Sequence, residues 1–230
     1  MEIRQLTAEE LLGPLNELEK KFAPKALFVA GDASFVQERA RVSIVGSRKA
    51  SPDAIRRARR LATLLTERGA VVVSGLAEGI DAAAHSACIE KGGKTIAVIG
   101  TPLDSVYPKE HAALQRKIME EHLCVSQFAP GVPVQRKNFP MRNRTMALIS
   151  DATVIIEASD TSGSLSQGWE ALRLGRGLFI TKAVAENSAL KWPSEMLGYG
   201  ARVLSNEGVE EFFAVLPERS ALAATYVAPF

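Results

Sequence analysis

The chain alternates short apolar runs with longer amphipathic segments. Runs rich in aliphatic and β-branched residues predict strands at 41–47, 70–75, 94–100, 124–128, 152–158 and 177–181. Between them, apolar residues at helical spacing predict helices at 53–69, 79–93, 110–122, 142–150 and 164–176. Because strands this uniformly apolar are buried on both faces, the pattern indicates a doubly wound α/β domain, a mostly parallel sheet flanked by helices.

The pattern also suggests a division of the chain. We expect an N-terminal extension over residues 1–25, a core domain over 26–182, and a C-terminal extension over 183–230 that packs on the core. The segment 129–140, "APGVPVQRKNFP", carries three prolines and predicts a mobile surface loop. The C-terminal part is less regular, and its segment 209–218 predicts a short helix.

Composition narrows the class of protein. The chain has 230 residues and is 47% hydrophobic, which suits one large domain with a substantial core. Its acidic N-terminus is unlike a signal peptide, and no run approaches the ~20 apolar residues that span a membrane. Cys88 and Cys124 lie in apolar surroundings without a metal-binding pattern. We therefore expect a cytoplasmic protein with reduced cysteines and no metal site.

The charge is nearly balanced overall, at +2, but it is unevenly distributed. Residues 41–60 hold seven basic side chains against one acidic side chain, and residues 136–144 hold four basic side chains and no acidic one. Both ends of the chain are rich in glutamate. This asymmetry favours a local anion-binding face, although the basic run from Arg56 to Arg60 equally fits the solvated side of a helix.

The loops that follow the strands carry the candidate chemistry. They read "GSRKAS", "SGLAEGID", "GTPLDSVYPKE" and "SDTSGSL" after the first, second, third and fifth predicted strands. Ligands of such sheets bind at the carboxyl ends of the strands, where glycine lets the backbone approach a phosphate and helix N-termini offer free N–H groups. None of these loops matches GxGxxG, so ordinary dinucleotide binding is not favoured.

Basic side chains lie beside these loops. Arg48 stands at the tip of the first loop, Lys109 follows Tyr-Pro in the third, and Arg142 and Arg144 flank Asn143 before the fifth strand. Arginine donates paired hydrogen bonds to phosphate, so the set predicts that a polyanion lies across the sheet edge. Bases could stack on nearby aromatic rings, although core or loop packing explains each ring as well; the candidates are Tyr107, Phe128 and Phe139.

One further pair has side chains suited to catalysis. Asp81 and His85 lie four residues apart on a predicted helix and could form an acid–base pair or half of a metal site. The plainer reading is that Asp81 orients a loop and His85 packs in the core. The sequence lacks HExxH, GxSxG and P-loop motifs.

Several of these motifs together resemble a known family. The segments "VSIVGSRKAS", "VVSGLAEGIDAAAH", "KTIAVIGTPLDSVYP", "FPMRNR" and "VIIEASDTSGSL" are similar in order and spacing to DNA processing protein A (DprA, also called Smf), over residues 10–182. The resemblance implies an extended Rossmann-like fold that binds single-stranded DNA and mediates recombination in natural transformation. It also implies a homodimer, a RecA-type recombinase as partner, and no enzymatic step or cofactor.

The family's DNA-binding positions can be carried over residue by residue. The resemblance assigns DNA or phosphate contacts to Gly46, Ser47, Arg48, Ser74, Gly75, Gly79, Lys109, Arg142, Asn143, Arg144, Ser162, Gly163 and Ser164. The chain departs from the family pattern in the helix after the SGS loop and after the sixth strand. No N-terminal helical domain or C-terminal winged-helix module is visible.

Rival functions remain open on the sequence. A nucleotide-binding sensor or an enzyme similar to the phosphoribohydrolases of the same fold superfamily would use the same loops. Those enzymes carry a GTxxE pattern, but the chain has Gln167 at the glutamate position, and glutamine cannot act as a carboxylate base. Glu170, one helical turn later, is the only nearby substitute. A purely structural partner protein would leave the converging loops unexplained.

Overall fold

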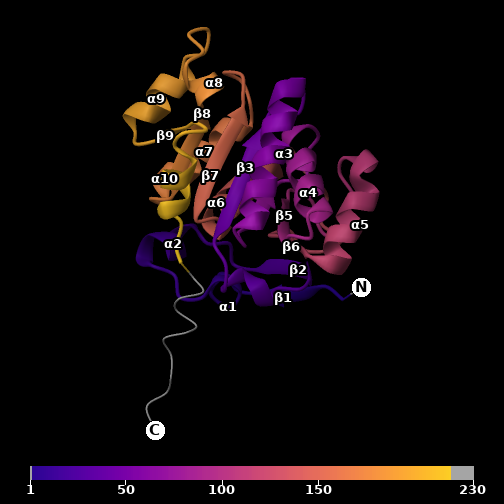
Figure 1. Cartoon of the computed structure of the whole chain (residues 1–230). Helices are drawn as coiled ribbons and strands as arrows, with labels where there is room; N and C mark the ends of the chain where they lie inside the picture. The colour runs from indigo at the N-terminus through magenta and orange to yellow at the C-terminus, as the bar shows by residue number, and fades with distance from the viewer. Residues whose placement is uncertain (1, 219–230) are drawn as a thin grey trace.

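The computed structural model describes residues 2–218, which contain one nine-stranded sheet in the order β1-β2-β6-β5-β4-β3-β7-β8-β9 (Figure 1). The strands in chain order are β1 (Arg4–Leu6), β2 (Leu27–Gly31), β3 (Arg41–Gly46), β4 (Val71–Ser74), β5 (Thr95–Ile99), β6 (Leu123–Ser126), β7 (Ala152–Glu157), β8 (Gly177–Thr181) and β9 (Arg202–Leu204). The seven strands from β6 to β9 in this order are parallel to one another. The predicted doubly wound, mostly parallel α/β fold is therefore confirmed.

Helices cover both faces of the sheet. One face carries α3 (Pro52–Glu67), α4 (Ile80–Glu90), α5 (Ala112–Glu121) and α10 (Val209–Ala214). The other face carries α1 (Ala8–Leu12), α2 (Glu17–Phe22), α6 (Asn138–Ile149), α7 (Ser164–Arg173), α8 (Lys182–Ala185) and α9 (Trp192–Gly198), and two 3₁₀ turns, η1 (Ser34–Val36) and η2 (Lys109–His111), lie in loops.

The alternation of side chains along each strand divides the core between the two faces. Val71 and Val73 of β4 belong to the hydrophobic cluster under α6 and α7, whereas Val72 belongs to the cluster under α3 and α4. Both clusters are fully buried at these positions, which explains the uniformly apolar strands. Local sequence signals mark the start of helix α3: the Ser51 hydroxyl caps its N-terminus, and Pro52 begins its first turn.

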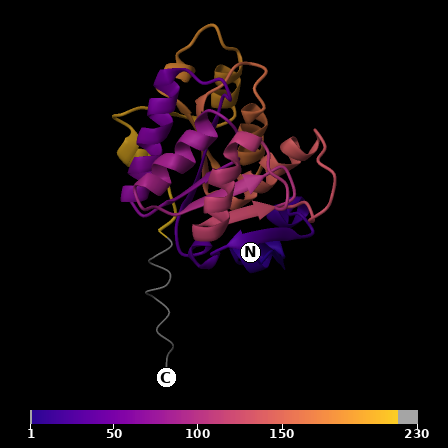
Figure 2. The same ribbon diagram turned by 90° about the vertical axis from the view of Figure 1, so that its right-hand side faces the viewer.

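The N-terminal segment was only partly anticipated. Strand β1 pairs antiparallel with β2, and β2 pairs antiparallel with β6, so residues 4–31 extend the sheet at one edge (Figures 1 and 2). Capping boxes at Thr7 and Asn16 begin α1 and α2. The proposed boundary between residues 25 and 26 therefore falls between the edge strand β1 and its neighbour β2. The division into three parts stays a prediction.

The C-terminal segment contains more structure than the pattern suggested. Helix α10 lies within the predicted 209–218 segment, but the short strand β9, parallel to β8, was not predicted. The expected C-terminal extension includes residues 219–230, which lie outside the described residues. Among residues 2–218, no helix combines the length and the apolar character needed to cross a membrane.

The segment before β7 folds differently from the prediction. Helix α6 begins at Asn138, whereas the sequence predicted a loop over 129–140 and a helix that begins at Arg142. The Arg-Asn-Arg triplet therefore lies one turn inside the helix rather than at its start. Because one helical residue turns the chain by about 100°, Arg142 and Arg144 point in nearly opposite directions.

Candidate nucleic-acid interface

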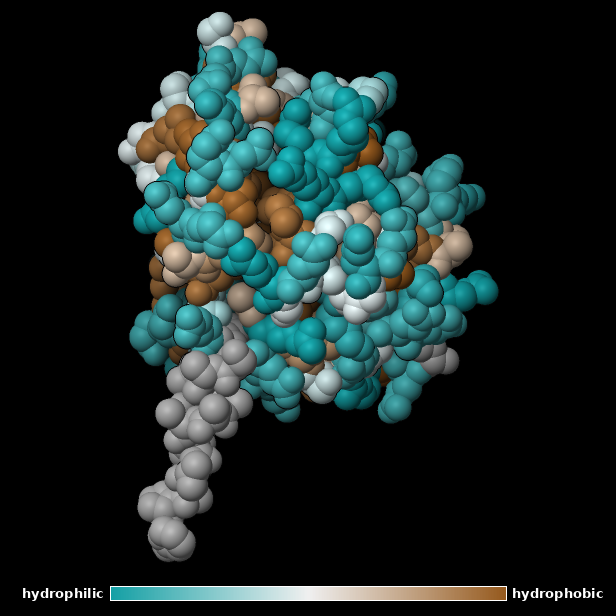
Figure 3. Space-filling model, viewed as in Figure 1, coloured by the Kyte–Doolittle hydropathy of each residue, from teal (hydrophilic) through white to brown (hydrophobic). Residues whose placement is uncertain are grey.

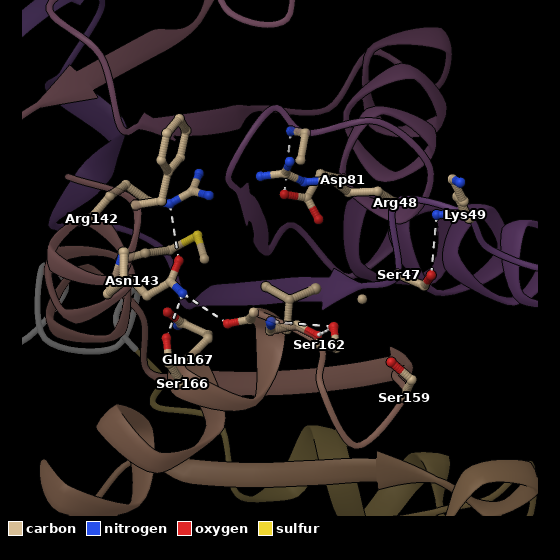
Figure 4. A pocket seen from close by; sticks show the side chains of 18 residues that line it. Ser47, Arg48, Lys49, Asp81, Arg142, Asn143, Ser159, Ser162, Ser166 and Gln167 are labelled. Carbon is tan, nitrogen blue, oxygen red and sulfur yellow. Dashed lines mark hydrogen bonds between the residues drawn. The ribbon is translucent and has the colours of Figure 1, made fainter. Parts of the chain in front are cut away.

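A pocket of about 590 Å³ lies where the order of the parallel strands reverses, between β3 and β7. The chain runs outward from β3 to β6 and then returns through α6 to β7 on the other side of β3. This is the switch point at which open α/β sheets bind their ligands. The loops after β3 and β7, together with one side of α6, form the walls (Figure 4).

The loop after β3 needs glycine where it meets its neighbours. A Cβ atom at Gly46 would lie 2.7 Å from Ile80 Cγ1 and 2.8 Å from Glu157 O. Gly79 has φ +76° and supports the same loop from below, because a Cβ there would lie 2.4 Å from Ser47 O. Ser47 N donates to Glu157 O at 2.7 Å. The two glycines thus allow the loop to pack tightly and leave the exposed Arg48 side chain at the pocket.

The loop after β7 offers hydroxyl and backbone groups. Ser162 Oγ and Ser164 Oγ lie 2.7 Å apart, and Gly163 has open space where a side chain would point. Helix α7 begins at Ser164, and its first three N–H groups donate within the turn: Ser164 N to Ser162 Oγ, Leu165 N to Ser162 O and Ser166 N to Gly163 O. The positive end of the helix dipole still faces the pocket. Ser162, Gly163 and Ser164 line the pocket. The predicted SGS loop and the predicted first loop therefore face one another across it.

Arg142 is buried and forms part of the pocket floor, only 6% exposed. Its Nη1 donates to Gly75 O at 2.6 Å and to Val98 O at 2.8 Å, and its Nε donates to Asn143 Oδ1 at 3.0 Å. A Cβ atom at Gly75 would lie 1.9 Å from Nη1, so that position requires glycine. The guanidinium group is thereby fixed in place before any ligand arrives.

Asn143 ties α6 to the SGS loop. Its Nδ2 donates to Gly163 O at 3.1 Å and to Ser166 Oγ at 2.6 Å. Gln167 is fully buried. In the orientation that satisfies both amide atoms, its nitrogen donates to Asn143 O and its oxygen accepts from Ala147 N. Asn143 and Gln167 therefore hold the loop in place, and Gln167 offers no carboxylate at its position.

Asp81 supplies the one carboxylate among the residues that line this pocket. Its Oδ2 accepts hydrogen bonds from Gly75 N at 3.1 Å and Ala77 N at 3.4 Å, which orients the second loop as expected. Burial raises the pKa of Asp81, although the Arg142 charge acts in the opposite direction. The carboxylate thus neutralises part of the positive charge while the loops keep their shape.

Asp81 and His85 do not form an acid–base pair. His85 Nδ1 lies 2.7 Å from the Thr95 hydroxyl, and that hydroxyl donates to Val72 O. Burial lowers the pKa of His85 to about 3, so the ring is neutral at physiological pH. His85 is completely buried and packs between α4 and the sheet, as the plainer reading of the sequence expected.

The other predicted residues are placed less centrally. Ser74 is buried and donates to Ile44 O at 2.6 Å, so together with Gly75 and Gly79 it supports the pocket from behind. Lys109 is exposed on η2, outside the pocket lining. Arg144 points toward α7, where it pairs with Glu170 at 3.2 Å, and its guanidinium lies 5.4 Å from the Phe22 ring. Glu170 therefore does not line the pocket either.

Aromatic rings extend the pocket on one side. The Arg48 guanidinium lies 5.9 Å from the Phe139 ring centroid, and the Phe139 and Tyr107 centroids are 5.4 Å apart. A small adjoining hollow is lined by Arg48, Phe139 and Tyr107 among others. Phe128, the third candidate for stacking, is half-buried and lines neither hollow.

Some pocket residues were not predicted. Ser159 and Ser166 flank the SGS loop, and Lys49 follows Arg48; all three line the pocket. Their positions next to predicted residues were the only signal in the sequence. The pocket thus combines one fixed guanidinium group, one exposed guanidinium group, hydroxyls and the N-terminus of a helix, a set suited to phosphate or another oxyanion.

The fold and the pocket define an α/β protein with a polar, arginine-containing pocket at the switch point of its sheet. Within that class, the chain belongs to the family of DNA recombination-mediator protein A, whose model matches residues 10–215. DNA processing protein DprA of Bacillus subtilis is 31% identical over 90% of the chain and 68% of that protein. The corresponding protein of Streptococcus pneumoniae is 41% identical over 68% of the chain and 55% of that protein.

Solved structures agree with this assignment. The DNA processing protein A of Streptococcus pneumoniae has a TM-score of 0.77 at 32% identity and covers 91% of the chain and 74% of its own. The Helicobacter pylori protein, solved to describe its single-stranded DNA binding mode, has a TM-score of 0.75 at 27% identity and covers 97% of both chains. The chain spans about half to two thirds of the length of the curated relatives above.

Proposed function

We propose that this chain binds single-stranded DNA at the switch-point pocket and acts as a recombination mediator in DNA uptake. The observation that carries the proposal is the continuity of the pocket with the aromatic hollow. Arg48 belongs to both and lies 5.9 Å from the Phe139 ring. Guanidinium and hydroxyl groups would bind phosphates while Phe139 and Tyr107 stack on bases, the usual combination in single-strand binders.

The roles of the proposed residues follow from their placement. Direct contact with the strand is proposed for Gly46, Ser47, Arg48, Arg142, Asn143, Ser162, Gly163 and Ser164, all of which line the pocket. Ser74, Gly75 and Gly79 would shape it, and Lys109 would meet the strand as it leaves past Tyr107. Arg144 is proposed only as a peripheral contact because Glu170 already pairs with it.

The test is fluorescence anisotropy with a labelled oligo-dT strand and its duplex at two salt concentrations. Arg48→Ala should weaken single-strand binding about tenfold, because it removes an exposed cation without disturbing the core. Arg202→Ala is the matched control, since it removes an exposed cation from the far edge strand β9. Binding that ignores Arg48, or that is insensitive to salt, would contradict the proposal.

A second candidate, the binding of one nucleotide, is favoured by the size of the pocket. A hollow of about 590 Å³ lies within the range of small-molecule sites. A nucleoside monophosphate would then bind with little dependence on salt. It would compete with oligo-dT for the pocket and for no other part of the surface. Tight mononucleotide binding without strand binding would favour this second reading.

We also propose that the protein acts as a homodimer in the cytoplasm. The support for the dimer is an exposed aromatic side chain: Tyr199 is 70% exposed, and its ring lies 5.3 Å from that of the half-buried Trp169. Exposed aromatic side chains are typical of protein interfaces. Tyr199→Asp should convert a dimer to a monomer in light scattering, while Arg202→Ala should not.

A RecA-type recombinase is the proposed protein partner, on the strength of the family assignment. If the chain loads such a recombinase, it should stimulate strand invasion on single strands coated with a competing binding protein. The stimulation should be lost in Arg48→Ala. Single-strand binding without any stimulation would limit the function to DNA binding.

A further inference from the structure

A second hollow, of about 490 Å³, opens on the opposite face of the sheet from the switch-point pocket. One wall is α3, and the other is formed by α8, the end of β9 and the start of α10. Figure 3 shows brown apolar residues at the bottom of this hollow and teal hydrophilic residues around it. We call it the α3 groove.

The floor of the α3 groove is aliphatic. Ile156 of β7, Leu204 of β9 and Leu61 of α3 are buried there, and Leu64 and Val209 are partly exposed. Helix α3 contributes a single stripe of residues at helical spacing, with Leu61 and Leu64 toward the floor. A bulky apolar side chain from outside could therefore replace water over this floor.

The basic residues of α3 differ in how they are paired. Arg56 pairs with Asp53 and Arg59 pairs with Glu90, and neither arginine lines the groove. Arg57 and Arg60 do line it, and among residues 2–218 neither has an ion-pair partner. Arg57 Nε is also buried without a hydrogen-bond partner in this part of the chain. The groove wall thus presents two uncompensated guanidinium groups above an apolar floor.

Nucleic acid is a poor match for this surface. None of the residues that line the groove is aromatic, so bases have no ring on which to stack. The opposite wall carries the carboxylates of Glu186 and Glu207, so any acidic ligand, phosphate or carboxylate, would pair along the α3 wall. Lys182 on that wall already lies 3.9 Å from Glu186. The unpaired positive charge is therefore confined to the α3 wall.

We propose that the α3 groove binds an acidic peptide segment of a partner protein, with a bulky apolar side chain on the floor. The acidic residues of the segment would pair with Arg57 and Arg60 along the α3 wall. This binding is separate from the proposed DNA site, because the two hollows share no lining residue. A partner could then be held while the DNA pocket is occupied.

The probe is a fluorescein-labelled hexapeptide of four aspartates followed by leucine and phenylalanine. Two matched probes replace the aspartates by asparagines or the last two residues by glycines. Anisotropy is measured with the full chain, the double variant Arg57→Glu with Arg60→Glu, and the control Arg56→Glu with Arg59→Glu. Both double variants change the net charge equally on one helix, and thermal unfolding followed by circular dichroism checks that each is folded.

We expect the groove variant to bind the acidic hexapeptide at least tenfold more weakly and the control to remain within threefold of wild type. Each altered probe should also bind at least tenfold more weakly to wild type. Leu64→Ser gives a second variant without charge reversal and should weaken binding several-fold. Oligo-dT binding should stay within twofold of wild type in the groove variant.

Three results would overturn the proposal. Equal losses in the groove variant and the control would show a general effect of charge. A parallel loss of oligo-dT binding in the groove variant would make the groove part of the DNA surface. A dimer that becomes a monomer only in the groove variant, as measured by light scattering, would show that a second copy of the chain occupies the groove.

Discussion

The switch-point pocket and the α3 groove lie on opposite faces of one sheet near the carboxyl end of β7, yet they are built differently. The pocket is made of glycine and serine loops around a buried arginine whose position is fixed by three hydrogen bonds. The groove is made of aliphatic side chains below arginines on a helix surface. The first is a polar site around a fixed arginine, and the second is a groove with an apolar floor. One fold can therefore present two chemically distinct surfaces.

The largest expected effect tests the rigidity of the pocket. Gly75→Ala forces a methyl group toward Arg142 Nη1, which a Cβ would approach to 1.9 Å. We expect a loss of about 3 kcal/mol in the free energy of unfolding, because the change overpacks the core and displaces a buried charge from its hydrogen bonds. Urea denaturation measures it.

The matched control for that change is Gly163→Ala in the facing loop. Its Cβ would meet nothing within 4 Å, and its φ of −62° suits alanine. We expect a change below about 1 kcal/mol. If the two variants were equally stable, Arg142 would be free to move and the pocket would not be rigid.

A smaller effect is expected where the pocket meets its aromatic extension. Phe139→Leu should weaken oligo-dT binding about tenfold, since stacking of one base contributes about 1–3 kcal/mol. Phe128→Leu should have little effect, because Phe128 lines neither hollow. Binding of the acidic hexapeptide at the α3 groove should be unchanged in both variants. Anisotropy with the two probes measures all four values.

The sequence predicted the pocket better than the α3 groove, because the two are built from different kinds of segment. The pocket is formed by loops directly after predicted strands, so the position of Ser47 or Ser162 in the sequence already indicates the sheet edge. The groove needs β9, whose three residues are too few to show a strand pattern, to lie beside β8. Its shape depends on tertiary packing that no local pattern records.

The Arg-Asn-Arg triplet shows a second limit. Prolines at 130, 133 and 140 favoured a loop, but Pro140 lies in the first turn of α6, where a missing N–H removes no helical hydrogen bond. The two arginines diverge in any helix that contains both, because residues two apart differ by about 200°. The sequence therefore identified both residues as candidates, but only the packing of α6 against its neighbours showed that Arg142 faces the pocket and Arg144 faces Glu170.

A further difference between the two regions is their response to pH. Burial raises the pKa of Asp81, so acid neutralises this pocket carboxylate earlier than an exposed aspartate. Oligo-dT should bind more tightly as the pH falls from 8 to 5, by about threefold more in wild type than in Asp81→Asn, because a nearby negative charge is lost. Equal pH profiles for the two proteins would show that the Asp81 charge does not reach the bound strand.

The smallest expected effect decides how a ligand lies in the α3 groove. Glu186→Gln removes a carboxylate from the wall opposite Arg57 and Arg60 and frees Lys182 from its 3.9 Å pairing. Because exposed charge interactions contribute about 0.5 kcal/mol, the acidic hexapeptide should bind about twofold more tightly and oligo-dT should not respond. Lys182→Gln should have the opposite effect on the peptide. If Glu186→Gln instead tightened oligo-dT binding, the two hollows would share one electrostatic field, and the separation between a polar DNA site and an apolar protein site would fail.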